Sequence, residues 1–260
     1  MNGRRIFCIA TLLLALLCGC TTQTEQELPQ FVIGSDEYRP YNYRDEDGNP
    51  AGIDVELAQE ACRRMGYEPI FKQFDWNERN LYLAAGEVDC IWDCFAMDGR
   101  EEEYAWVGPY MYSRQVAAVL QNSEMQHLPE LEDKNIAVRA SSKAETIFLE
   151  HTDENIPIVR NVYCMNELSE VITAMRNNYV DACAGPEAAL REQMELDNVL
   201  YRFLEEDLTH GEVGIAFAKD SDAALRALLA ETLEEMREDG TTERILQKYG
   251  IDTDKALGCF

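Results

Sequence analysis

Short apolar segments alternate with amphipathic helical patterns along this chain, and the same alternation occurs in each half. In the first half, the apolar segment 31–34 precedes a helical stripe that runs from Leu57 to Met65. In the second half, segment 135–139 precedes a helical segment over 142–150. Each half continues with a further strand, helix and strand, and this order favours a mostly parallel sheet covered by helices. The pattern therefore predicts an α/β fold with two similar lobes.

The same pattern places the expected elements and divides the chain. The expected strands cover residues 31–34, 69–74, 90–92, 135–139, 156–162, 182–184 and 213–218. The expected helices begin at or near Asp54, Glu78, Ser142, Asn166, Leu225 and Thr242. Because the last elements return to the first half, one lobe is expected over 30–114 and 213–260 and the other over 115–212. Two lobes joined by crossing strands leave a cleft, in which ligands preferentially bind and which hinge bending closes.

The first residues of the chain are typical of a targeting signal. Two arginines precede an apolar run over 6–17, which is shorter than the roughly 20 residues that a membrane-spanning helix needs. The run ends in Leu17-Cys18-Gly19-Cys20, which resembles a bacterial lipobox. We therefore expect a lipoprotein signal peptide over 1–19, lipidation of Cys20 and a polar tether over 20–29, so that acyl chains hold the exported protein at a membrane. An ordinary secretory signal with an incidental Cys20 is the alternative.

The chain is strongly acidic, with 49 Asp and Glu residues against 23 Lys and Arg residues and a net charge of −26. Nucleic acids and anionic membrane surfaces attract basic patches, so this composition argues against both as partners. The nine cysteines and three histidines lack the spacing of a zinc site, and no metal or cofactor is expected. Export permits disulfides, but the six cysteines after Cys20 fit buried free thiols equally well.

Four segments together resemble one protein family. They are IGSDEYRPY at 33–41, DGNPAGIDVELA at 47–58, GPYMY at 108–112 and MREDGT at 236–241. Their order and spacing within 31–250 are similar to those of the bacterial extracellular solute-binding proteins of family 3, the amino-acid receptors of ABC importers. The resemblance implies a two-lobed, type II periplasmic-binding-protein-like fold with two crossing hinge strands. It also implies a monomeric, lipid-anchored, extracytoplasmic receptor that delivers an amino acid to an ABC transporter permease and is not an enzyme.

The resemblance assigns the ligand's carboxylate to Arg100, which lies where the family places its carboxylate-binding arginine. A guanidinium suits this role because it offers a carboxylate two parallel donors. Segment 140–143 resembles the family's helix N-terminus, and we expect Ser142, Lys143 and the backbone amides there to bind the same carboxylate. The alternatives are that Arg100 is a solvated surface arginine and that Ser142 is an ordinary N-cap.

Two aromatic residues and one acid are expected beside the ligand's side chain. Tyr38 and Trp76 match the aromatic residues that stack on ligands in this family, although aromatic side chains more often pack in the core. Asp36 resembles the acid that meets the side-chain nitrogen in receptors for basic amino acids. We therefore expect these three side chains in the cleft.

The partner of the ligand's ammonium departs from the family pattern. A proline precedes Glu187 where the family has an aspartate, so either Glu187 binds the ammonium or the ligand is anchored differently. Asp93 and Cys94 are also assigned to the site, and Asp93 replaces a neutral residue. Because a buried carboxylate needs a cation, we expect Asp93 to meet the ligand's ammonium or a basic side chain such as Arg100 or Arg139. These features favour a polar or cationic amino acid as the ligand.

Two other functions fit the same fold. Cyclohexadienyl dehydratases resemble this family, and their chemistry needs a positioned acid, for which Asp93 or Glu187 would serve. However, no histidine falls in a cleft motif, and a lipid anchor fits delivery to a membrane partner better than soluble catalysis. A sensory role is the other alternative, in which the closed lobes contact a membrane receptor that supplies the output domain.

Overall fold

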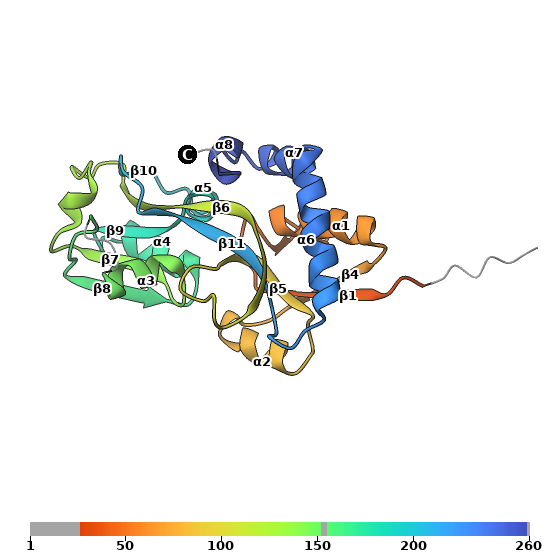
Figure 1. Ribbon diagram of the computed structural model, residues 1–260. Helices are drawn as coiled ribbons and strands as arrows, with labels where there is room; N and C mark the ends of the chain where they lie inside the picture. Colours follow the sequence, from red (N-terminus) through yellow and green to blue (C-terminus); the bar gives the residue numbers. More distant parts are fainter. Residues whose placement is uncertain (1–26, 152–154, 259–260) are drawn as a thin grey trace, which may run out of the picture.

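The computed structural model describes residues 27–151 and 155–258 (Figure 1). The expected signal peptide over 1–19, the lipidation site Cys20 and most of the tether over 20–29 lie outside these residues. Among the described residues, no helix is long and apolar enough to span a bilayer.

One mixed sheet of nine strands runs through the described part of the chain. Its strand order is β4-β1-β5-β11-β6-β9-β7-β8, and β10 pairs with β6. The strands are β1 (Gln30–Ser35), β4 (Glu68–Gln73), β5 (Cys90–Ala96), β6 (Ala105–Leu120), β7 (Asn135–Arg139), β8 (Asn161–Met165), β9 (Ala182–Pro186), β10 (Tyr201–Phe203) and β11 (Thr209–Phe217). A separate two-stranded sheet joins β2 (Tyr43–Arg44) and β3 (Pro50–Ala51).

The sheet is parallel toward each end and antiparallel in the middle. β1 pairs in parallel with β4 and β5, and β7 pairs in parallel with β8 and β9. β6 and β11 pair antiparallel with each other, β11 also joins β5, and β6 also joins β9. The prediction of an α/β fold with two mostly parallel parts and two connecting strands is therefore confirmed.

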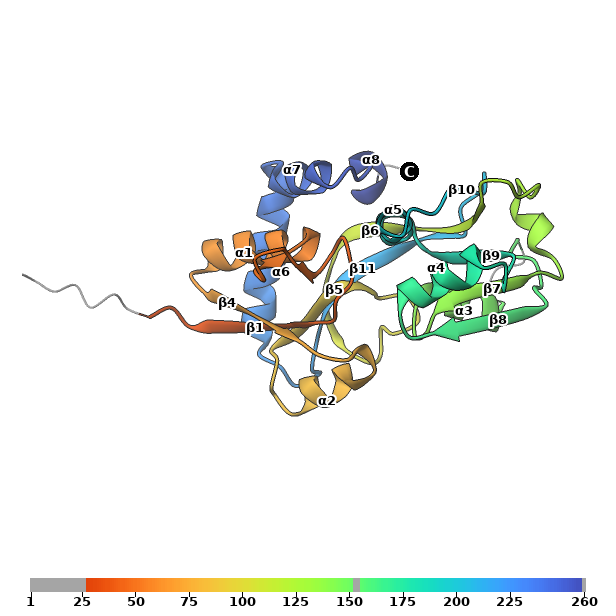
Figure 2. The same ribbon diagram turned by 180° about the vertical axis from the view of Figure 1, so that it is seen from behind.

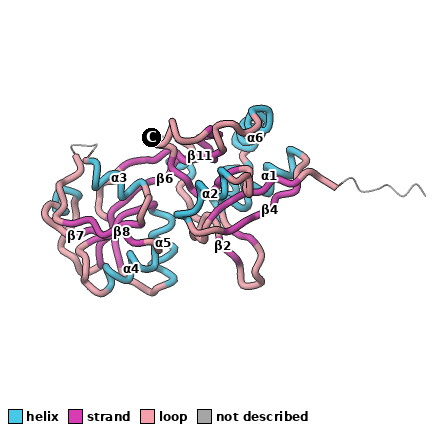
Figure 3. The backbone as a smooth tube through the Cα atoms, turned by 90° about the horizontal axis from the view of Figure 1, so that it is seen from below, coloured by secondary structure: helices cyan, strands magenta, loops and turns pink. Residues whose placement is uncertain are grey.

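Helices cover both parallel parts, which form the two lobes seen in Figures 2 and 3. The first lobe contains β1, β4 and β5 with the turn η1 (Trp76–Glu78), α1 (Ile53–Met65), α2 (Arg79–Ala84), α6 (Ala223–Glu238), α7 (Thr241–Lys248) and α8 (Thr253–Ala256). The second lobe contains β7, β8 and β9 with the turn η2 (Leu128–Leu131), α3 (Lys143–Glu150), α4 (Leu168–Arg176) and α5 (Glu187–Leu196). The expected boundaries at 114 and 212 fall inside the continuous strands β6 and β11, and they stay a prediction.

Helix α6 returns the end of the chain to the first lobe by packing against α1. The apolar stripe predicted for α1 is buried at Leu57, Ala58, Ala61 and Cys62. On α6, Leu229, Leu233 and Met236 are buried in the same core cluster. Burial of two apolar stripes against each other is the main force that joins these distant segments.

Three expected boundaries differ from the structure. The strand expected over 156–162 is wrong, because β8 covers Asn161–Met165, and Pro157 before it has no N–H for a ladder. Helix α1 begins after Gly52, so Asp54 is not its N-cap. Helix α7 begins at Thr241 after Gly240, so Thr242 is not a cap either.

The start of α1 requires a glycine at position 52. Gly52 has a φ of 124°, and a Cβ there would lie 2.2 Å from the backbone oxygen of Tyr41. At the other end of α1, Gly66 has a φ of 76°, but no atom lies within 4 Å of the corresponding Cβ position. The two glycines therefore differ in crowding although both have a positive φ.

Gly52→Ala is expected to lower the free energy of unfolding by about 3 kcal/mol or more, because the backbone around Tyr41 has to move. The matched control Gly66→Ala is expected to lose only about 1 kcal/mol, the cost of a left-handed alanine. Urea unfolding followed by circular dichroism measures both values. Equal losses in the two variants would contradict the steric role given to Gly52.

Candidate functional site

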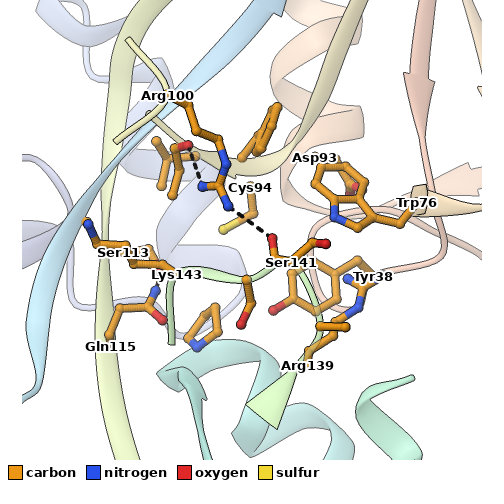
Figure 4. A pocket seen from close by; sticks show the side chains of 17 residues that line it. Tyr38, Trp76, Asp93, Cys94, Arg100, Ser113, Gln115, Arg139, Ser141 and Lys143 are labelled. Atoms are coloured by element: carbon orange, nitrogen blue, oxygen red, sulfur yellow. Dashed lines mark hydrogen bonds between the residues drawn. The ribbon is translucent and has the colours of Figure 1, made fainter. Parts of the chain in front are cut away.

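A small cavity lies between the two lobes, beside β6 and β11 (Figure 4). Its volume is about 50 Å³, and residues of both lobes line it. Seven of the nine expected ligand-binding residues line this cavity: Tyr38, Trp76, Asp93, Cys94, Arg100, Ser142 and Lys143. The other two lie elsewhere, Asp36 in an adjoining cavity and Glu187 in a different one.

Arg100 follows β5 and reaches across the cleft. Its Nη2 donates to the backbone oxygen of Ser141 at 3.1 Å, and its Nη1 donates to that of Ala96 at 3.3 Å (Figure 4). Burial and the guanidinium of Arg79 lower the pKa of Arg100. Within 27–151 and 155–258, no carboxylate forms an ion pair with Arg100, so two carbonyl oxygens hold this guanidinium at the cavity wall.

The N-terminus of α3 forms the opposite wall. Ser142 is the N-cap, and its Oγ accepts from the backbone N–H of Glu145 at 3.2 Å, as the sequence predicts. The Glu145 carboxylate accepts from the N–H of Ser141 at 2.8 Å rather than from that of Ser142. Lys143 Nζ lies 3.8 Å from Asp98 of the first lobe. The helix start therefore brings a positive macrodipole end and an ammonium toward Arg100.

Arg139, at the end of β7, forms a buried ion pair with Asp36 across the cleft. Its guanidinium carbon lies 4.6 Å from the ring centre of Tyr38 and 5.9 Å from that of Trp76. Its Nε also donates to the backbone oxygen of Asn166 at 3.2 Å. Burial opposes the charge, but the Asp36 carboxylate keeps the pKa of Arg139 above its usual value.

Asp93 lies on β5 with its carboxylate buried at the cavity floor. Its Oδ1 accepts from Asn42 Nδ2 at 2.7 Å, and its Oδ2 accepts from the backbone N–H of Asp36 at 3.1 Å. Burial, and then the neighbouring Asp36 carboxylate, raise the pKa of Asp93, whereas Arg139 lowers it. Among the described residues, Asp93 forms no direct ion pair, and its hydrogen-bond partners include a neutral amide, a peptide N–H and the Asp36 side chain.

Cys94 has a φ of 46°, which is unusual for a residue other than glycine. Its backbone N–H donates to Asp54 Oδ2 at 2.6 Å, and Asp54 Oδ1 accepts from the Tyr110 hydroxyl at 2.7 Å. Burial raises the pKa of Asp54 to about 6. Asp54 is thus a buried acceptor that holds Cys94 in place, rather than the helix cap predicted from its position.

Glu187 is not brought to the cavity between the lobes. Its Oε2 accepts from Arg114 Nη1 at 2.5 Å, and its other oxygen pairs with Arg191 on the same helix. It lines a separate cavity of about 210 Å³ that also contains Tyr112 and His210. The alternative that Glu187 binds the ligand's ammonium is therefore not supported by its position.

The described residues contain no cluster of metal-binding side chains. All five cysteines among them are free thiols, and Cys164 is the exposed one. Burial raises the pKa of Cys62 and of Cys183 to about 12, so these thiols stay protonated. Cys259 lies outside the described residues.

A model of the bacterial extracellular solute-binding proteins of family 3 matches residues 31–252. The chain belongs to this family. Family 3 relatives include the histidine-binding periplasmic protein of Escherichia coli K12, which is 28% identical over 93% of this chain and 95% of its own length. The probable amino-acid-binding protein YxeM of Bacillus subtilis is 24% identical over 93% of this chain and 92% of its own length.

Solved structures confirm the fold expected for a family 3 protein. An arginine periplasmic binding protein from Legionella pneumophila has a TM-score of 0.74 at 21% identity and covers 86% of this chain and 100% of its own. An ancestral amino-acid-binding protein, described as a precursor of cyclohexadienyl dehydratase, has a TM-score of 0.70 at 19% identity and covers 85% and 94%. These likenesses establish the type II fold with two lobes and carry no function to this chain.

The sequence analysis missed several polar site residues of this family 3 protein, among them Arg139, Asn42, Ser113 and Gln115. Arg139 is named there only as one partner for Asp93, although its position directly before segment 140–143 is a usable signal. Asn42, which donates to Asp93, carries no signal of its own because it lies in a turn-rich stretch. The structure therefore adds a second cleft guanidinium and an amide to the expected set.

Proposed function

We propose that this family 3 protein is a lipid-anchored, extracytoplasmic receptor that binds an amino acid between its lobes and delivers it to an ABC transporter permease. The observation that carries this proposal is the guanidinium of Arg100. It faces the N-terminus of α3 across a cavity and has no ion-pair partner among the described carboxylates. A ligand carboxylate would compensate the positive charge of Arg100 and the positive end of the α3 helix dipole.

The ligand's ammonium is assigned to Asp93. Its carboxylate lines the same cavity as Arg100, whereas Glu187 is already paired with two arginines elsewhere. An ammonium at this place favours the ionised form of Asp93, which burial otherwise disfavours. The zwitterionic part of an amino acid would thus lie between Arg100 and Asp93.

Contacts between the lobes support closure as the step that retains the ligand. Arg100 contacts Ser141, Lys143 lies near Asp98, and Asp36 pairs with Arg139, and each contact joins the first lobe to the second. β6 and β11 are the continuous connections about which the lobes would open. Opening would break these contacts and admit a ligand from solvent.

The place in the cell and the partner are inferred from the N-terminal sequence and from the relatives. The lipobox-like sequence before Cys20 would give a membrane anchor, and a polar tether would let one monomer reach a permease. The relatives include proteins described as histidine-binding and arginine-binding. These descriptions support an amino acid as the ligand.

A second candidate function is a dehydratase, and one observation favours it. Burial and Asp36 raise the pKa of Asp93, and a protonated carboxyl in a cleft is what general acid catalysis needs. Incubation with prephenate or arogenate, followed by detection of an aromatic product, tests it. An aromatic product that Asp93→Asn abolishes would favour the enzyme over the receptor.

Arg100→Ala is expected to weaken binding of the amino acid by about 2–5 kcal/mol, because it leaves the ligand's carboxylate buried and unpaired. A thermal-shift screen of the twenty amino acids identifies the ligand, and calorimetry then measures both proteins. Arg160→Ala is a matched control, since Arg160 is an exposed arginine of the second lobe that pairs with Asp133. Unchanged affinity in Arg100→Ala would remove Arg100 from the site.

Ligand affinity is expected to fall as the pH is lowered, because Asp93 must lose its proton to meet an ammonium. In the pH range where Asp93 is protonated in the free protein, the Kd rises by about tenfold for each unit by which the pH is lowered. Calorimetry between about pH 5 and pH 7, where the ligand stays zwitterionic, measures this slope. Asp93→Asn is expected to bind more weakly and without the slope, whereas a flat profile in the wild-type protein contradicts the assignment.

A further inference from the structure

The groups expected to receive the ligand's side chain are already occupied by a residue of the protein. The guanidinium of Arg139 lies over the ring of Tyr38 and within 5.9 Å of the ring centre of Trp76. It also forms the buried ion pair with Asp36, and Figure 4 shows Arg139 next to the Tyr38 ring, with Trp76 beyond it. The aromatic faces and the acid that would recognise a cationic side chain thus already hold a cation.

We propose that Arg139 is a built-in cation that occupies the side-chain subsite and restricts the ligand to amino acids with an uncharged side chain. This inference rests on the proposed function and narrows it. The sequence favours a polar or cationic amino acid. This inference keeps the polar, uncharged amino acids as ligands and excludes the cationic ones.

Arg139 also limits the length of the ligand by separating two cavities. The inner cavity, with Arg100 and Asp93, has a volume of about 50 Å³. An outer cavity of about 530 Å³ is lined by Asp36 and also by Arg139. Trp76 and Arg139 line both cavities, so a long side chain that starts in the inner one meets Arg139 before it reaches the outer one.

The charges around the inner cavity balance for a ligand with a neutral side chain. Arg139 is paired with Asp36, and Lys143 lies 3.8 Å from Asp98. Arg100 and Asp93 then remain for the ligand's carboxylate and ammonium. A cationic side chain would bring a further positive charge beside Arg139 in the inner cavity, where Asp93 is the only carboxylate among the described lining residues, and this is unfavourable at a buried position.

Three contacts from two segments of the chain hold Arg139 in this position. Besides the ion pair, its Nε donates to Asn166 before α4, and its guanidinium lies against the Tyr38 ring. The attraction between a guanidinium and an aromatic face adds to the ion pair when both are removed from water. A cationic ligand would have to displace all three contacts to reach Asp36.

Calorimetry on the whole mature protein tests the inference with alanine, serine, asparagine and glutamine against arginine and lysine. The wild-type protein is expected to bind at least one neutral amino acid roughly 100-fold more tightly than arginine or lysine. The reason is that the side-chain charge of arginine or lysine would be buried without a partner. Arg139→Ala joins the two cavities and leaves Asp36 unpaired. It is therefore expected to bind arginine or lysine more tightly than the wild-type protein, again by roughly 100-fold.

Two further variants control for folding and for the loss of a positive charge in general. The double variant Asp36→Asn with Arg139→Ala removes both charges of the pair, so it is expected to fold and to show no gain for arginine or lysine. Arg114→Ala removes an arginine that pairs with Glu187 and Asp207 outside the inner cavity, and it is expected to keep the wild-type preference. Equal gains in Arg114→Ala would overturn the inference.

The wild-type measurement alone decides between the remaining outcomes. Binding of arginine or lysine as tightly as any neutral amino acid overturns this inference and leaves the proposed function intact. A wild-type protein that binds no amino acid overturns the proposed function and the inference together. A neutral ligand in the wild-type protein, with a gain for arginine or lysine in Arg139→Ala only, supports both.

Discussion

The pairing of β6 with β11 is the constraint on which the rest of the structure depends. The two strands pair antiparallel from Gln115 opposite Thr209 to Ala105 opposite Phe217, and each also joins one of the parallel parts. A register shift falls between Val213 and Ile215, where Gly108 and Gly214 lie close together. A Cβ on Gly108 would lie 3.0 Å from the Cα of Gly214, so this close approach favours glycine. β6 has two extra residues at the shift, because Met111 to Val107 lies opposite Val213 to Ile215. The β6–β11 pair thus positions both lobes and the cavity between them.

Burial of charge is the second constraint, and this protein meets it with hydrogen bonds inside the first lobe and with one buried ion pair across the cleft. Asp54 is held by a peptide N–H and a tyrosine hydroxyl, and Asp36 by a guanidinium of the other lobe. Asp93 is held by a peptide N–H and an amide, and burial, followed by the neighbouring Asp36 carboxylate, raises its pKa well above that of a solvated aspartate. The most weakly compensated groups on either side of the cavity, Asp93 and Arg100, are of opposite charge. That arrangement fits a zwitterion.

The sequence predicts the elements whose signal is local and misses those that depend on tertiary contacts. The apolar stripe of α1 and the N-cap at Ser142 follow from spacing alone, and both agree with the structure. The long strand β6 escapes prediction because Gly108 and Pro109 interrupt its pattern, and only its partner β11 makes it continuous. Among the site residues, the sequence analysis assigns Arg100 and Asp93 to the ligand site, and both line one cavity in the structure. It does not predict that Glu187 pairs with Arg114 and Arg191, because adjacent residues line different cavities: Pro186 lines the one between the lobes and Glu187 the other.

The buried ion pair of Asp36 and Arg139 is expected to add little to the stability of the fold and more to the choice of ligand. Removing two charges from water costs about as much as their attraction returns, so apolar residues of similar volume would stabilise the fold equally well or better. Apolar residues would, however, leave the space beside Tyr38 and Trp76 open to a ligand's apolar side chain. A guanidinium fixed by an acid, an aromatic face and the Asn166 carbonyl oxygen instead closes that space with a positive charge. The proposed role of the pair is therefore to select the side chain that the cavity accepts, rather than to stabilise the fold.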